Sequence, residues 1–198
     1  MSHRQLPSPP RRRALPYVAL VAVVAVAAVA LWVVAFTRTG ETTQVACARP
    51  ETGVEVSSTG LLGEVPARPS AIPVRVLNAN GEAGEATEVS EGLVGLGFTR
   101  APDNPVGNDP LVPDQDLECY GQIRFGTAFA AHGATLHALF PCLELFDDGR
   151  EDGSVDVALG RGFGGLDDSG PVRAAMSTLN SGGEVDTATL QSMNSRTC

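Results

Sequence analysis

The stretch VRVLNANGEAGEATEVSEGLVGLGFTR, residues 74–100, decides the fold of this chain. Alternating apolar and polar residues from Val74 to Asn78 predict a β-strand, and Asn80-Gly81 predicts a turn after it. From about Glu82 to Leu96, apolar residues recur at three- and four-residue steps, which predicts an amphipathic helix. Gly97 is expected to end this helix as a left-handed cap, and a second strand follows. The apolar positions of the helix are Ala83, Ala86, Val89, Leu93 and Leu96.

The same order of elements returns further along the chain. Residues 120–125 predict a strand, Thr127–Phe140 a helix stopped by the next proline, and Cys142–Phe146 another strand. Val155–Leu159 predicts the last strand, and the proline-rich residues 102–115 predict a long loop. We therefore expect an α/β (α+β) sandwich. Its two strand–helix–strand units would form one sheet of about four or five strands, with the helices on one face.

The rest of the chain divides around this predicted domain at 73–165. Residues 1–14 form an arginine- and proline-rich tail, 15–36 an apolar helix, and 37–72 a stalk that contains Cys47. Residues 166–198 are expected to form a polar tail with one short helix and an otherwise loose end, which a disulfide at Cys198 would tie down.

Residues Leu15 to Phe36 predict a single transmembrane helix. About 22 apolar residues without a charge can cross a hydrocarbon core of roughly 30 Å. A buried core helix and a cleaved signal peptide are the alternatives, but the segment is too long for both and has no small-residue cleavage site. Positive residues stay on the cytoplasmic side, so the N-terminus is expected inside and the domain outside the cytoplasm. The positive residues before the helix are Arg4, Arg11, Arg12 and Arg13.

The charge of the chain limits its partners. The formal net charge is −9, and four of the arginines lie in the N-terminal tail, so the part outside carries the acidic excess. Nucleic acid needs a basic patch, so it is excluded as a partner. Simple charge-driven binding to phosphate-rich polymers or anionic lipid is disfavoured for the same reason.

Four cysteines follow the apolar helix, on the oxidising side, and predict two disulfides. They are Cys47, Cys119, Cys142 and Cys198. Topology favours Cys119–Cys142, because Cys119 precedes one strand, Cys142 begins the strand after the crossover helix, and parallel strands begin at the same edge of a sheet. Cys47–Cys198 would then join the ends of the domain. The main alternative pairs Cys47 with Cys142 and Cys119 with Cys198.

The quoted stretch resembles the opening of the LytR C-terminal domain family. That family opens with a hydrophobic strand, an Asn-containing turn and a Gly-x-Ala motif at the start of a helix. Its helix ends in a motif like the one at Leu93–Phe98. Residues 123–126 and 155–160 also look like that family, so the resemblance covers roughly residues 73 to 163. The whole layout, with Cys47–Pro50 and Ser57–Gly63, resembles actinobacterial envelope integrity proteins. The resemblance implies a membrane protein needed for envelope integrity, and it implies no catalytic residues.

One turn is a candidate ligand site. Asn78, Asn80, Gly81 and Gly84 precede a helix N-terminus, where free N–H groups could bind an anion. The adjacent glutamates would repel a phosphate, which leaves a neutral glycan hydroxyl as a ligand. The alternative is a tight structural turn with glycines at positive φ.

No catalytic, cofactor or metal site is predicted. His132 and His137 are five residues apart and do not share a helix face, and no nucleophile elbow or Cys–His dyad occurs. A calcium site is weighed at one acidic turn, which lacks EF-hand spacing and is better explained as solvated. Its acids are Asp147, Asp148, Glu151 and Asp152.

We therefore expect a membrane-anchored, extracytoplasmic, non-catalytic protein that binds a cell-wall polymer or an envelope protein. The first alternative is an accessory subunit that regulates a glycan-attaching LytR-type ligase, and the second is a small wall hydrolase. The chain is too short to hold the catalytic domain that precedes this domain in longer relatives, so that activity is not carried over.

Overall fold

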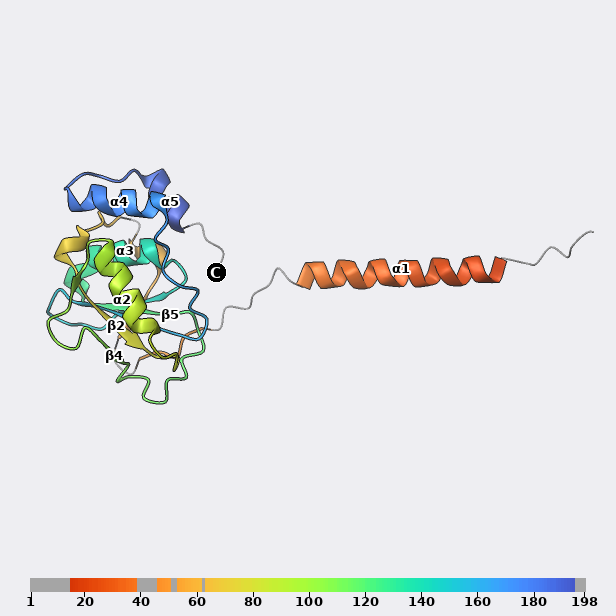
Figure 1. Ribbon diagram of the computed structural model, residues 1–198, viewed down its shortest axis with the longest axis horizontal. Helices are drawn as coiled ribbons and strands as arrows, with labels where there is room; N and C mark the ends of the chain where they lie inside the picture. Colours follow the sequence, from red (N-terminus) through yellow and green to blue (C-terminus); the bar gives the residue numbers. More distant parts are fainter. Residues whose placement is uncertain (1–14, 39–45, 51–52, 62, 195–198) are drawn as a thin grey trace, which may run out of the picture. The chain divides into compact units, whose positions relative to one another are not determined.

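The computed structural model describes residues 15–38, 46–50, 53–61 and 63–194 (Figure 1). The chain forms two compact units, Met1–Thr43 and Gln44–Cys198. The first contains helix α1, Leu15–Arg38, whose side chains are described from residue 18 to residue 29. Over the described residues, no helix has the length and apolarity needed to cross a membrane. The predicted span Leu15–Phe36 extends beyond those side chains and stays a prediction.

The second unit is built on one mixed sheet of seven strands, six of which follow the order β1-β6-β5-β7-β2-β3. The seventh strand, β4, also pairs with β2, further along that strand than β3. Strand β2 runs parallel to β7, β3 and β4, and β5 runs parallel to β6. The pairs β5–β7 and β1–β6 are antiparallel. The strands are β1 (Val54–Val56), β2 (Pro73–Asn78), β3 (Thr99–Arg100), β4 (Val106–Asn108), β5 (Gly121–Phe125), β6 (Glu144–Asp147) and β7 (Val155–Leu159).

The helices are α2 (Glu85–Gly95), α3 (Ala130–Leu139), α4 (Gly170–Asn180) and α5 (Thr187–Asn194), with 3₁₀ turns η1 (Ser58–Leu61), η2 (Pro69–Ala71) and η3 (Thr127–Phe129). All four α-helices of this unit lie on one side of the sheet, with α4 and α5 outermost (Figure 1). They share one apolar core with the sheet. The mixed α/β architecture with helices on one face is therefore confirmed.

The two strand–helix–strand units are present as β2–α2–β3 and β5–α3–β6, each with parallel strands. The expected count of four or five strands is wrong. Strand β4 lies inside the predicted loop 102–115, and β1 from the predicted stalk joins the edge of the sheet. Each has only three residues, so neither carries enough alternation to be read from sequence.

Two further corrections concern the helices. The described part of the C-terminal tail is not loose, because α5, Thr187–Asn194, packs on α3 and buries Met193. Helix α2 begins at Glu85 and leaves Ala83 exposed, since Gly84 before it adopts a left-handed φ of 90°. The other predicted apolar positions of α2 are buried, and Gly97 has the predicted left-handed conformation with φ 97°.

The core lies between the sheet and α2, α3, α4 and α5. Ile72, Ile123 and Leu136 are fully shielded from solvent within it. Helix α3 comes close to the sheet at Gly133, where a Cβ atom would lie only 2.7 Å from the ring of Phe125. A glycine at this position therefore sets the distance between the helix and the strand.

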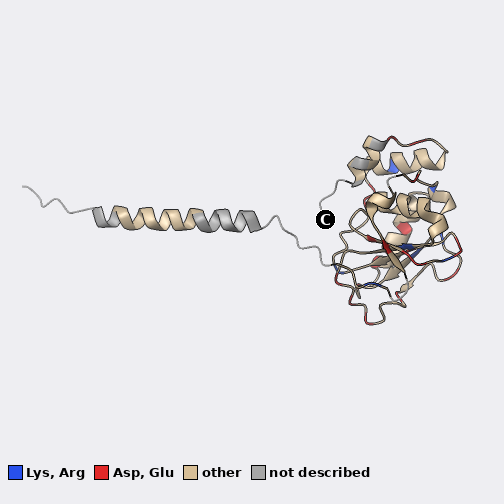
Figure 2. Ribbon diagram, turned by 180° about the vertical axis from the view of Figure 1, so that it is seen from behind, with Lys and Arg blue, Asp and Glu red and all other residues tan. Residues whose placement is uncertain are grey.

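The opposite face of the sheet carries buried polar side chains beside a small apolar cluster. Because side chains alternate along a strand, the neighbours of Ile123 and Val157 point away from the helices, and the polar ones among them are Gln122, Arg124 and Asp156. All three are buried, so loop segments cover this face too. Figure 2 shows acidic and basic residues interspersed over the strands and loops of this unit.

Candidate functional site

The predicted ligand turn forms a compact hydrogen-bonded structure after β2. The Asn78 Oδ1 atom accepts the backbone N–H groups of Asn80 at 3.1 Å and Gly81 at 2.9 Å. The Asn80 side chain donates to Glu85 Oε2 at 2.6 Å and to the Gly160 carbonyl at 3.1 Å. Gly81 and Gly84 have positive φ of 83° and 90°.

These bonds connect three elements. Asn78 lies opposite Leu159 in the β2–β7 register, Gly160 follows β7, and Glu85 begins α2. The structure thus brings the four predicted residues together, with the polar atoms of both asparagines bonded inside the protein. This arrangement supports the tight-turn interpretation, and ligand binding at the turn stays a prediction.

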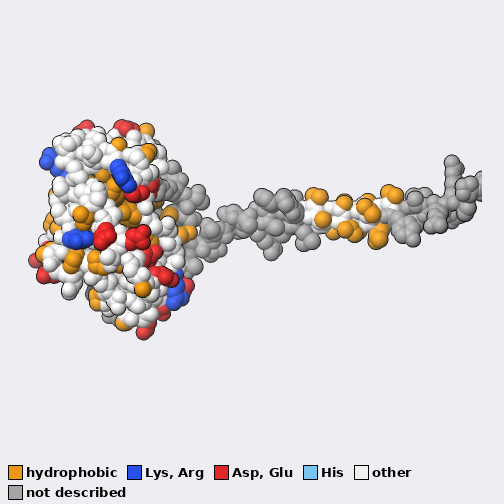
Figure 3. Space-filling model, in the orientation of Figure 1, with side chains coloured by type: hydrophobic (Ala, Val, Ile, Leu, Met, Phe, Trp, Pro, Cys, Tyr) orange, Lys and Arg blue, Asp and Glu red, His pale blue; other side chains and the backbone are white. Residues whose placement is uncertain are grey.

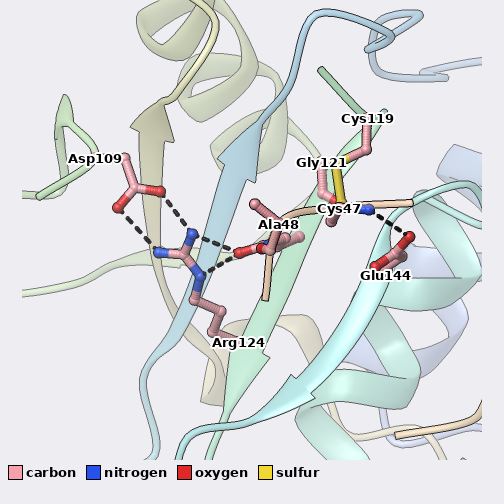
Figure 4. Close-up of a disulfide and its surroundings, with 8 residues drawn as sticks. Cys47, Ala48, Asp109, Cys119, Gly121, Arg124 and Glu144 are labelled. Atoms are coloured by element: carbon pink, nitrogen blue, oxygen red, sulfur yellow. Dashed lines mark hydrogen bonds and ion pairs between the residues drawn. A yellow bond between two sulfur atoms is a disulfide. The ribbon is translucent and has the colours of Figure 1, made fainter. Parts of the chain in front are cut away.

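A disulfide between Cys47 and Cys119 attaches the start of the second unit to the sheet (Figure 4). Their Cα atoms are 4.9 Å apart, and both residues are buried. The backbone N–H of Cys47 also donates to Glu144 Oε1 at 2.9 Å. The segment 46–50 is therefore bound to the strands β5 and β6 at their starting ends.

The predicted pairs Cys119–Cys142 and Cys47–Cys198 are wrong, and so is the alternative pairing. Strands β5 and β6 do begin at the same edge, with Gln122 opposite Glu144. However, Cys119 packs with Cys47 in a small apolar cluster on the face without helices. Its sulfur therefore meets the segment that crosses that face. Cys142 is also disulfide-bonded, and Cys198 lies outside the described residues.

Arg124 is the centre of a buried polar cluster next to this disulfide (Figure 4). Its guanidinium contacts both carboxylate oxygens of Asp109, at 3.0 and 2.7 Å, and donates to Gln122 Oε1 at 2.8 and 2.6 Å. Gln122 in turn donates to the Ala48 carbonyl at 2.7 Å. The side chains of Arg124 and Asp109 are 2% and 0% exposed, so this ion pair is isolated from water. The cluster joins the loop after β4, strand β5 and segment 46–50.

A second ionic cluster lies on the same face. Arg150 bridges Asp148 and Asp156, and Arg75 contacts the other oxygen of Asp156 at 2.9 Å. Burial alone would lower the pKa of the Arg150 guanidinium, but hydrogen bonds and attraction from Asp156 and Asp148 raise it overall. Arg150 therefore stays charged and serves as a fixed cation rather than as an acid or base.

The acidic turn is bonded within the protein. Asp147 accepts a hydrogen bond from Thr127, and Asp148 pairs with Arg150. The Asp152 carboxylate accepts hydrogen bonds from Ser154, which lower its pKa. Within the described residues, no group of three or more His, Cys, Asp or Glu residues could hold a metal ion. His132 Nδ1 lies 2.8 Å from the Gly153 carbonyl oxygen. His137 lies elsewhere, next to Pro141 and Cys142.

A groove of about 540 Å³ lies beside β1, and the sequence did not indicate it. We call it the β1 groove. Its lining comes from three separated segments, so no local pattern could have found it. The lining residues are Arg49, Val54, Glu55, Val56, Ser57, Ser58, His137, Pro141, Cys142, Leu143, Glu144 and Leu145. On the face of this unit seen in Figure 3, hydrophobic side chains are scattered among polar ones, and acidic side chains lie beside basic ones.

Comparison with known proteins identifies the family. Over 200 residues, which cover 95% of this chain and 91% of the relative, the sequence is 34% identical to the cell envelope integrity protein Cei of Mycobacterium tuberculosis. The chain belongs to the Cei family. Residues 71–163 match the domain family described as LytR cell envelope-related transcriptional attenuator, so the resemblance to the LytR C-terminal domain is confirmed.

A solved structure supports the same assignment for the Cei-family fold. The soluble domain of a conserved hypothetical secreted protein from Mycobacterium marinum superposes with a TM-score of 0.67 and 39% sequence identity. The match covers 75% of this chain and 99% of that domain.

In this member of the Cei family, segments outside the matched residues 71–163 complete the domain. The segment before it supplies Cys47 and six residues of the β1 groove, from Arg49 to Ser58. The segment after it supplies α4 and α5, which cover the inner helices. The β1 groove is therefore built jointly by the LytR-type region and the segment that precedes it.

Proposed function

We propose that this chain is a membrane-anchored, extracytoplasmic and non-catalytic protein that supports envelope integrity by binding wall material or envelope proteins. The observation that carries the proposal is the 34% identity to the envelope integrity protein Cei over nearly the full length of both chains. The polar clusters around Arg124 and Arg150 are consistent with a structural role, because their charges are paired with one another.

The test is co-sedimentation of the oxidised ectodomain, Thr37–Cys198, with purified insoluble cell wall at low and high salt. We expect binding that resists salt, because the acidic domain cannot depend on attraction to anionic polymers. Binding that disappears at high salt, or no sedimentation at all, would contradict direct wall recognition. Either result would favour binding to an envelope protein instead.

The proposed topology places the N-terminus in the cytoplasm, the span at Leu15–Phe36 and the domain outside. Protease added to intact spheroplasts tests it. We expect an epitope after the domain to be digested and an epitope at the N-terminus to be protected. The reverse pattern would contradict the proposed orientation.

An accessory role for a glycan-attaching ligase is the second candidate, and the LytR-type match at residues 71–163 favours it. Crosslinking from the domain in intact cells separates the two candidates. A ligase as the dominant crosslinked product supports the accessory role, whereas wall fragments as the dominant product support direct binding.

A further inference from the structure

The β1 groove combines polar groups with apolar side chains. Arg49, Glu55, Ser57 and Ser58 come from the segment before the LytR-type region, and Glu144 comes from β6. Val54 and Val56 are the exposed and half-buried apolar side chains of the lining, whereas Leu143 and Leu145 are buried in the core. Ligand pockets usually have volumes of about 300–1,000 Å³ and mix apolar walls with a few placed polar groups, so the β1 groove falls in this class.

The charges in the groove are unbalanced. Arg49 is its only guanidinium among the described lining residues, and it pairs with Glu55 at 2.9 Å. Glu144 is a second carboxylate, and its Oε1 atom accepts only a backbone N–H from Cys47 among the contacts described for it. Among the described lining residues, one negative charge therefore has no cationic partner.

His137 does not supply the missing positive charge at neutral pH. Burial lowers the pKa of its imidazole, and a hydrogen bond with the backbone of Pro141 offsets this in smaller measure. The groove therefore disfavours anionic ligands such as phosphate. Carboxylates are acceptors only, so they favour a ligand rich in donors.

We propose that the β1 groove binds a short peptide that carries a primary ammonium group. An ammonium has three donors and one positive charge, which would balance the charge of Glu144, while Glu55 stays paired with Arg49. The aliphatic parts of such a peptide match Val54 and Val56, which are exposed and half-buried in the lining. The inference rests on the proposed function in one respect, since it names the peptide part of the wall, rather than its glycan, as the ligand.

Calorimetric titration of the oxidised second unit, residues 44–198, tests the proposal. This unit is compact by itself, and the soluble domain of the Mycobacterium marinum relative forms crystals. The probe is a synthetic peptide with blocked ends and one free lysine amine, and its control is the same peptide with that amine acetylated. We expect binding of the free-amine peptide and at least a tenfold loss on acetylation.

A pair of charge-reversed variants locates the site. Glu55→Arg changes the groove, while Glu88→Arg makes the same change on the exposed face of α2, outside the groove. We expect Glu55→Arg to weaken peptide binding at least tenfold and Glu88→Arg to leave it within twofold. Equal loss in both variants would overturn the site, because it would show dependence on net charge alone. Tighter binding of a neutral oligosaccharide than of the free-amine peptide would overturn the ligand class.

Wall sedimentation of the same proteins separates the two proposals. If the unmodified domain sediments with wall and Glu55→Arg sediments equally well, the groove inference fails and the proposed function stands. If the domain does not sediment but binds the peptide in a Glu55-dependent manner, wall binding fails and the groove inference stands. Parallel loss of both activities in Glu55→Arg supports both.

Discussion

On the helix-covered face of the sheet, Ile123, Val157 and Leu159 are fully buried among other apolar side chains. On the opposite face, Arg124 and Asp156 are almost as deeply buried, but each is held by ion pairs. The first face is stabilised because apolar surface is removed from water, and this effect does not require a particular orientation of the contacting side chains. The second depends on specific partners, because an unpaired buried charge is costly.

This difference explains how each face responds to change. An apolar core loses stability in proportion to the volume removed, and neighbouring side chains adjust in part. A buried ion pair tolerates loss of one partner poorly, although an apolar replacement of both partners is often neutral. The disulfide Cys47–Cys119 lies on this second face, where both cysteines also pack in a small apolar cluster.

The largest effect is expected from breaking the buried ion pair. Asp109→Ala should lower the free energy of unfolding by about 3–5 kcal/mol, because Arg124 is left charged without its partner in a site closed to water. Urea denaturation measures it. Ile123→Val is the matched control, because Ile123 lies next to Arg124 in β5 but on the helix-covered face. Its expected loss of unfolding free energy is about 0.5–1.5 kcal/mol.

The double variant Asp109→Leu with Arg124→Met sharpens this prediction. We expect it to be more stable than Asp109→Ala alone, since no uncompensated charge remains. A loss below about 1 kcal/mol for Asp109→Ala would contradict the isolation of the pair, since only exposed ion pairs cost so little.

The next effect comes from the disulfide. Cys47 and Cys119 are 72 residues apart, and loop-closure entropy gives up to about 4 kcal/mol of stabilisation for such a loop. The double variant Cys47→Ser with Cys119→Ser should therefore lower the unfolding free energy by about 2–4 kcal/mol. In this variant the backbone amide of residue 47, which donates to Glu144 in the unmodified protein, should exchange its hydrogen faster. Unchanged protection of that amide would show that polar contacts alone hold the segment.

The smallest effect is a pH dependence at His137. Burial lowers the pKa of its imidazole in the folded state below 6.5, so the unfolded chain takes up its proton first as pH falls. The stability contribution of neutral His137 should therefore be complete above pH 6.5 and decrease as pH drops through that value. It levels off below the folded-state pKa. The measurement is the difference in unfolding free energy between pH 7.5 and 5.5, for the unmodified domain and for His137→Gln.

We expect His137→Gln to lose less stability over this range, because it lacks the titrating imidazole. An identical change in the two proteins would contradict a buried neutral His137. Glu55→Gln, in the same groove, controls for the change of a polar group there.

Sequence patterns were most informative where contacts are local. The helix at residues 85–95 and the strands β2, β5 and β7 follow periodicity and turn residues, so they were predicted to within a few residues. The Asn78–Gly84 turn was also found from its residues, since its glycines and its Asn78 hydrogen bonds lie within seven positions of one another. Its connection to Gly160 was not, because that contact spans 80 residues.

The β1 groove and the Arg124 cluster had no sequence signal. Arg124 lies in a predicted strand, and a local pattern does not show which distant side chains meet it. Only the position of Asp109 and of Ala48 shows that the face on which it lies is covered. Short strands such as β1 and β4 form because longer neighbours offer unpaired hydrogen-bonding groups, which a local pattern does not contain.

By itself, the sequence determined the order of the main elements, the one-sided arrangement of the helices and the relation to the LytR-type domain family. The first two follow from periodicity and turn chemistry, which act between residues close in the chain, and the third rests on the resemblance of its motifs to that family. Only the tertiary structure decided that Cys47 bonds to Cys119, that the face without helices is closed, and that three separate segments line one groove. These depend on which distant segments meet, and loop closure leaves many such meetings open until the whole core and its polar contacts select one.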